Sequence, residues 1–91
     1  MNAYVLSYDL RQPGRNYAGL FSAIKSAPRW AHVLESTWVI WSPKSAEHIL
    51  GVLTPHIDAN DGLVVLRLAS PAEGWWAGLA SDVSDELRNN L

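Results

Sequence analysis

The first apolar stretch of the chain, residues 3–9, is rich in β-branched and aromatic residues and predicts a β-strand. Pleat alternation divides its side chains between two faces, with Tyr4, Leu6 and Tyr8 on one and Val5, Ser7 and Asp9 on the other. A helix is predicted next, because apolar residues recur every three or four positions from Tyr17 to Ala27. Asn16 is placed to cap this helix and Pro28 to end it.

Two strands joined by a tight turn or a bulge are predicted over residues 31–35 and 37–41, because Glu35-Ser36-Thr37 is the only polar interruption between them. Both faces of the second strand are apolar, which is typical of a central strand or of one covered by a partner. A second helix is predicted with Ser42 as cap and Pro43 as its first residue. Its apolar face would consist of Ile49, Leu50, Val52 and Leu53.

The last strand is predicted over residues 63–69, after a turn at residues 58–62. Residues 72–91 look helical, since Val83, Leu87 and Leu91 recur every four positions. The resulting order of elements predicts an α+β fold, a ferredoxin-like βαββαβ plait with a helical C-terminal tail. We therefore expect one domain over residues 1–91, with the plait in 1–70 and the tail in 71–91.

The amino-acid composition excludes several classes of function. The chain has no cysteine, which excludes disulfides, thiolate metal sites and cysteine nucleophiles and fits a reducing compartment, so we expect a cytoplasmic protein. No signal peptide and no membrane-spanning segment are expected, because the apolar runs are short. A net charge of −2 argues against coating duplex DNA through phosphate contacts.

The predicted strand order 4-1-3-2 brings polar residues together at one edge of the sheet. Asp9 would end the first strand beside the starts of the third strand, at Ser36 and Thr37, and of the fourth, at Asn60 and Asp61. Carboxylate and hydroxyl oxygens suit a hard cation such as Mg²⁺ or Mn²⁺. The alternative interpretation is that these residues cap turns, which is their usual role.

A loop that leaves the same edge carries two arginines, which could hold phosphate oxygens near such a cation. Asp9 is therefore the candidate catalytic residue and, with Asp61, the candidate metal ligand. The candidate phosphate-binding residues are Arg11, Arg15, Ser36 and Thr37.

Five tryptophans are more than one core of this size is expected to hold, so some are predicted to lie in a subunit interface. The candidate interface residues are Val5, Trp38, Ile40, Leu63, Trp75 and Trp76. The segment Gly74–Gly78 is expected to pack the tail onto the sheet or onto a partner protein, with base stacking by exposed tryptophan as the alternative.

Three short motifs resemble a known family. Tyr8-Asp9 closing an apolar strand, the stretch Glu35–Ile40 and the strand Val64–Leu68 resemble the small CRISPR-associated Cas-two-like proteins of bacterial defence, in particular the SinR-like subgroup. The virulence-associated protein D ribonucleases are related to that family. The resemblance implies a ferredoxin-like homodimer in which two copies of Asp9 face each other across the two-fold axis. Some members are Mg²⁺-dependent nucleases and others are non-catalytic scaffolds.

Two interpretations of function follow. In the first, the chain is a homodimeric, non-catalytic interaction or scaffold module that associates with a protein partner or with RNA or DNA. In the second, it is an Mg²⁺- or Mn²⁺-dependent endoribonuclease with Asp9 as metal ligand at the dimer axis. The acidic net charge and the few charges in Gly14–Tyr17 favour a standalone role over spacer acquisition.

Overall fold

A computed structural model describes residues 1–91 as one four-stranded antiparallel sheet with three α-helices. The class is α+β, as predicted. In chain order the elements are β1 (Asn2–Asp9), α1 (Ala18–Ile24), β2 (Arg29–Leu34), β3 (Thr37–Ser42), α2 (Ala46–Leu53), a short 3₁₀ turn (Thr54–His56), β4 (Gly62–Arg67) and α3 (Ser81–Asn90). The sheet order is β2-β3-β1-β4, so β1 is central and β2 and β4 are edges.

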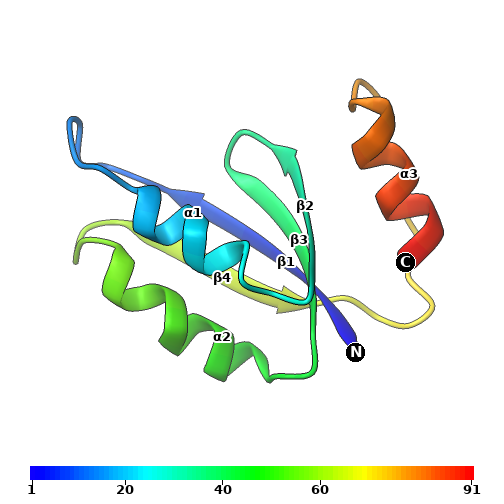
Figure 1. The fold of residues 1–91 in the computed structure, drawn as a ribbon, viewed down its shortest axis with the longest axis horizontal. Coiled ribbons are helices and arrows are strands. Elements are labelled where there is room, and N and C mark those ends of the chain that lie inside the picture. Colours follow the sequence, from blue (N-terminus) through cyan, green and yellow to red (C-terminus); the bar gives the residue numbers. More distant parts are fainter.

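One face of the sheet is covered by α1 and α2, which lie next to each other, whereas α3 lies apart from them beside β2 (Figure 1). Tyr4, Leu6 and Tyr8 point to the covered face, as pleat alternation predicts. The cluster beneath α1 and α2 consists of Tyr4, Leu6, Tyr8, Leu20, Ile24, Trp38, Ile40, Ile49 and Leu53.

The opposite face of the sheet is covered only in part. Leu87 of α3 packs against Ala31, Val39 and Trp41, which belong to β2 and β3. The indole N–H of Trp41 donates to the Asn90 carbonyl at 3.0 Å and fixes the end of α3. The part of this face formed by β1 and β4 is less covered: Val5 is half-buried against the cluster that includes Leu87, whereas Val64 and Leu66 are exposed. We call its four residues, Val5, Ser7, Val64 and Leu66, the open strip.

Two predicted boundaries were wrong for local reasons. The second helix begins at Ala46 and is capped by Ser45, whose hydroxyl accepts from the His48 N–H at 3.1 Å. Ser42 instead ends β3, and its hydroxyl accepts from the Lys44 N–H. The predicted helical tail is helical only from Ser81, because residues 71–80 form irregular backbone. No helix exceeds ten residues, which is too short to cross a membrane.

The interface prediction needs correction for two residues. Trp38 and Ile40 are 1% and 3% exposed, because their position in β3 points them under α1 and α2 and into the core. They are therefore not accessible to a second subunit. Leu63 is half-buried against the same core, and Trp76 is half-buried beneath α3. Of the candidate tryptophans only Trp75, at 95%, is freely exposed.

Candidate functional site

The structure brings Asp9, Arg11, Asn60 and Asp61 together where β1 ends and β4 begins. Arg11 links its parts: Nε donates to Asp9 Oδ2 at 2.9 Å and Nη1 donates to the Asn60 carbonyl at 2.8 Å. Gln12 adds a hydrogen bond from its amide to Asn60 Oδ1 at 3.0 Å. The loop after β1 is thus attached through polar contacts to the loop before β4.

Asp61 is the centre of this attachment, and both of its carboxylate oxygens have donors. Oδ1 accepts from the Arg11 backbone N–H at 2.7 Å. Oδ2 accepts from the Tyr17 hydroxyl and from the Asp58 N–H, each at 2.8 Å. Asp61 therefore connects three separate points of the chain. This is the turn-stabilising role that the sequence left open as an alternative to metal binding.

The hydrogen bonds also set the ionisation of the two side chains. Partial burial acts to raise the pKa of Asp61, but the N–H donors of Arg11 and Asp58, the Tyr17 hydroxyl and the charge of Arg15 together lower it below 3.8. For Tyr17, burial and then the hydrogen bond to Asp61 raise the pKa above 10.0. Both shifts keep Asp61 charged and Tyr17 protonated, the forms in which their hydrogen bond is made.

The remaining basic residue of the cluster is also paired. The Arg15 guanidinium forms an ion pair with Asp58 and lies 5.4 Å from the centre of the Tyr17 ring. Each arginine of the loop therefore already has a carboxylate partner, Arg11 with Asp9 and Arg15 with Asp58. Binding a phosphate at either would first require exchange of that partner.

The predicted phosphate ligands Ser36 and Thr37 lie at the start of β3 and make other contacts. The Ser36 carbonyl accepts from the Tyr8 N–H at 3.1 Å. The Thr37 hydroxyl lies 3.4 Å from that of Ser7, on the face that carries the open strip. No hydrogen bond joins either residue to Asp9, Arg11 or Asp61, so the predicted cluster divides into two parts.

The side chains of one chain do not form a divalent-cation site. No three His, Cys, Asp or Glu side chains of one chain are grouped so that they could hold a metal ion. Asp9 is the most available carboxylate of the cluster: its side chain is 69% exposed and only Oδ2 is paired. One free carboxylate oxygen is a poor Mg²⁺ site. A site here would need oxygens from a second chain.

An aromatic network near this edge, made of the buried Tyr8 and Trp38 and the exposed His32, was not foreseen from the sequence. The Trp38 indole N–H donates to the Tyr8 hydroxyl at 3.1 Å, and that hydroxyl donates to the Glu35 carbonyl at 3.1 Å. His32 stacks on Trp38 with ring centres 3.8 Å apart, and its Nε2 lies 3.1 Å from the same Glu35 carbonyl. The cross-strand pairing of His32 with Trp38 in the hairpin is the feature that could have indicated this network.

Searches of family models, of curated proteins and of solved structures found no match to this chain. The chain is a small α+β protein in which α1 and α2 pack on one face of the sheet and α3 covers part of the other. The Cas-two-like resemblance stays a prediction based on short motifs.

We expect Asp61→Asn to destabilise the fold near neutral pH, because an amide cannot accept from all three donors. A carboxyl with a lowered folded-state pKa stabilises above its ordinary value of 3.8 and loses this effect as pH falls through the folded-state pKa. Urea unfolding from pH 7 to pH 3 should therefore show wild type and variant converging only in the acid range. Asp85→Asn, at an exposed pair with Arg88, is the control. A pH-independent difference would contradict this role.

Proposed function

We propose that the chain is a ferredoxin-like plait that acts as a small homodimeric interaction module, with the open strip as its self-association surface. The βαββαβ order, the antiparallel order β2-β3-β1-β4 and the two helices on one face support the plait. The half-covered opposite face supports the interaction role. The resemblance to the SinR-like subgroup points the same way, since it implies a homodimer.

The observation that carries the proposal is the exposure of apolar side chains on paired strands. Leu66 lies opposite Val5, and Val64 lies opposite Ser7, so their side chains form one continuous surface. Val64 is 49% exposed and Leu66 is 61% exposed, although α3 shields the neighbouring β2–β3 half of the same face. Burying this surface against a second copy would add to the apolar area that the small chain removes from water.

A two-fold arrangement suits this surface because it would be self-complementary. In an isologous dimer the same patch is used by both subunits, so one apolar strip suffices. Asp9 follows Ser7 on the same face of β1 and pairs with Gly62. Two strips packed about a two-fold axis would therefore have their Asp9 carboxylates at equivalent positions beside the interface.

The second candidate function, an Mg²⁺- or Mn²⁺-dependent nuclease, depends on this placement of Asp9. One exposed carboxylate per chain does not make a metal site, but two copies would double the oxygen donors. The single-chain geometry favours the non-catalytic module, because Arg11 and Arg15 are paired with carboxylates and Asp61 serves the loops.

We expect wild type to have twice its 10.1 kDa mass in analytical ultracentrifugation, and Leu66→Glu to be monomeric. A charge buried in a small apolar interface should weaken the dimer by about 30-fold or more. Leu50→Glu, at an exposed leucine of α2 on the other side of the molecule, should leave the dimer intact. A monomeric wild type, or equal dissociation by both variants, would refute the proposed surface.

The same preparations separate the two functions. Wild type, Leu66→Glu and Asp9→Asn are incubated with labelled RNA and Mg²⁺ or Mn²⁺. The module predicts no cleavage by any of the three, with wild type and Asp9→Asn dimeric and Leu66→Glu monomeric. Metal-dependent cleavage by wild type that both variants lose would replace the module with the nuclease.

A further inference from the structure

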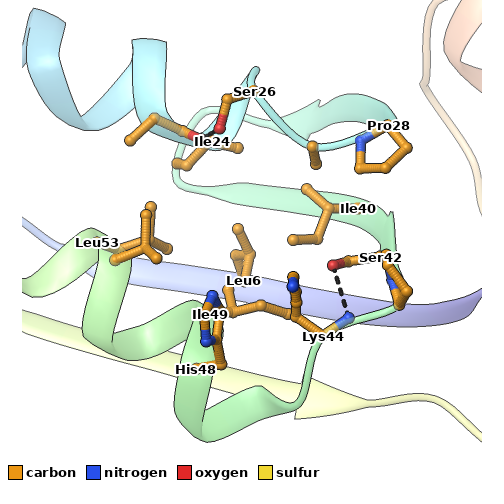
Figure 2. A pocket seen from close by; sticks show the side chains of 14 residues that line it. Leu6, Ile24, Ser26, Pro28, Ile40, Ser42, Lys44, His48, Ile49 and Leu53 are labelled. Carbon is orange, nitrogen blue, oxygen red and sulfur yellow. Dashed lines mark hydrogen bonds between the residues drawn. The ribbon is translucent and has the colours of Figure 1, made fainter.

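A pocket of about 250 Å³ lies between α1 and α2, above the sheet and away from both the Asp9 cluster and the open strip. Figure 2 shows Leu6 and Ile40 of the sheet beneath it, with Ile24 on one side and Ile49 and Leu53 on the other. Its inner wall is thus made of aliphatic side chains. These residues also belong to the main core, so the pocket is an opening into that core.

The size of the pocket suits a small organic molecule. An apolar cavity of roughly 150 Å³ in a protein core is large enough to bind benzene. If ligand size scales with cavity volume, this pocket would hold a ligand of about ten non-hydrogen atoms. It is too small for a nucleotide or for a peptide helix.

Apart from Ser26, whose hydroxyl donates to the Ala23 carbonyl, the polar side chains of the lining lie where β3 passes into α2. Ser42, Lys44 and His48 lie together along this end of the pocket in Figure 2. The Lys44 ammonium and the His48 imidazole have no hydrogen bond or ion pair within the chain, although their backbone N–H groups do. Ser42 is 5% exposed, and its hydroxyl oxygen accepts from the Lys44 N–H at 3.1 Å, which leaves the hydroxyl proton to donate.

The ionisable side chains that line the pocket are all basic. Among its 14 residues there is one lysine and one histidine, and there is no aspartate or glutamate. Elsewhere on this acidic chain the arginines Arg11, Arg15, Arg29 and Arg88 are each paired with a carboxylate. An unpaired ammonium at the mouth of an apolar pocket is complementary to an anionic group attached to a hydrocarbon body.

We propose that this pocket binds a small apolar carboxylate of about ten non-hydrogen atoms. The hydrocarbon part would lie against the more accessible apolar residues Ala27, Ile49 and Val52, above the buried floor of the pocket. The carboxylate would accept hydrogen bonds from the Lys44 ammonium and the Ser42 hydroxyl, with His48 beside it. This binding function does not depend on the dimer, because no pocket residue belongs to the open strip.

The test uses the full chain, labelled with ¹⁵N, and two carboxylates of suitable size, phenylacetate and octanoate. Each is titrated while amide chemical shifts are followed, with phenylacetamide and octanamide as uncharged analogues. We expect saturable shifts around the pocket, and binding at least about 10-fold weaker for the amides and for Lys44→Met. Lys25→Met is the matched control, because Lys25 lies over Trp30 and outside the pocket.

Lys44 is exposed, so its substitution should not affect folding, and an unchanged amide spectrum of the free variant verifies this. The proposal is overturned if neither carboxylate gives saturable shifts up to about 10 mM, well beyond ordinary small-ligand affinities. It is equally overturned if the amides bind as tightly as the acids. Val52→Phe, at the exposed rim, should block the pocket without removing a charge and abolish the shifts.

Discussion

Replacing Trp38 by alanine is expected to lower the free energy of unfolding by about 3–5 kcal/mol, the usual range for a buried tryptophan. A chain of 91 residues has a total stability of roughly 5–13 kcal/mol, so this one change removes a large share of it. The indole is 1% exposed and contacts His32 on one side and Trp30 and Phe21 on others. Alanine would leave a cavity that surrounding aromatic rings cannot close.

The matched control for this prediction is Trp75→Ala, the same substitution at a side chain that is 95% exposed. It should change stability by no more than about 0.5 kcal/mol. Urea unfolding followed by far-UV circular dichroism avoids the altered tryptophan fluorescence. If Trp38→Ala stays within about 1 kcal/mol of wild type, Trp38 is not the core residue described above.

The second large effect is expected for Tyr8→Phe, which should cost about 1–3 kcal/mol. The tyrosine hydroxyl is the acceptor of the buried Trp38 indole N–H, so its removal leaves that donor without a partner. The tyrosine hydroxyl also donates to the Glu35 carbonyl. In the variant that carbonyl still has His32 Nε2 at 3.1 Å. The unpaired indole is therefore the main reason for the loss.

Tyr4→Phe provides the comparison, because Tyr4 is also buried, at 2% exposed against 8% for Tyr8, but its hydroxyl only donates to the Lys44 carbonyl at 2.5 Å. Water can replace that donor at an exposed residue, so we expect a cost of about 0.5–1.5 kcal/mol. In a Trp38→Phe background, which lacks the indole N–H, the cost of Tyr8→Phe should fall below about 1 kcal/mol. Equal costs in both backgrounds would mean that the hydroxyl does not serve Trp38.

The fold was predictable to the extent that it depends on alternation. Tyr4, Leu6 and Tyr8 are on the covered face because residues two apart share a side of a strand. Alternation does not show which face of a strand the helices cover. In β3 both faces are apolar, so the sequence does not distinguish them. Trp38 was therefore assigned to an interface, whereas its pairing with Leu6 places it in the core.

The candidate site was predictable in its location and less so in its chemistry. Topology alone brings Asp9 near Asp61, and the structure places Arg11 between them. What the sequence does not show is the competition for carboxylate oxygens. The backbone N–H groups of Arg11 and Asp58 occupy Asp61, and such donors are invisible to an analysis of side-chain types. The pocket at Lys44 was missed because it forms from four separate segments.

The position of β4 at the edge of the sheet has a consequence for the behaviour of many copies of the chain together. One side of this strand presents unpaired backbone groups, and Arg67 is the one charged residue of its sequence, Gly62–Arg67. Such an edge is a template for adding strands from other molecules, and so for aggregation. A charge in such a strand disfavours the addition of strands from other molecules, and Arg67 supplies that charge. Its contribution is therefore to solubility and not to the stability of a single molecule.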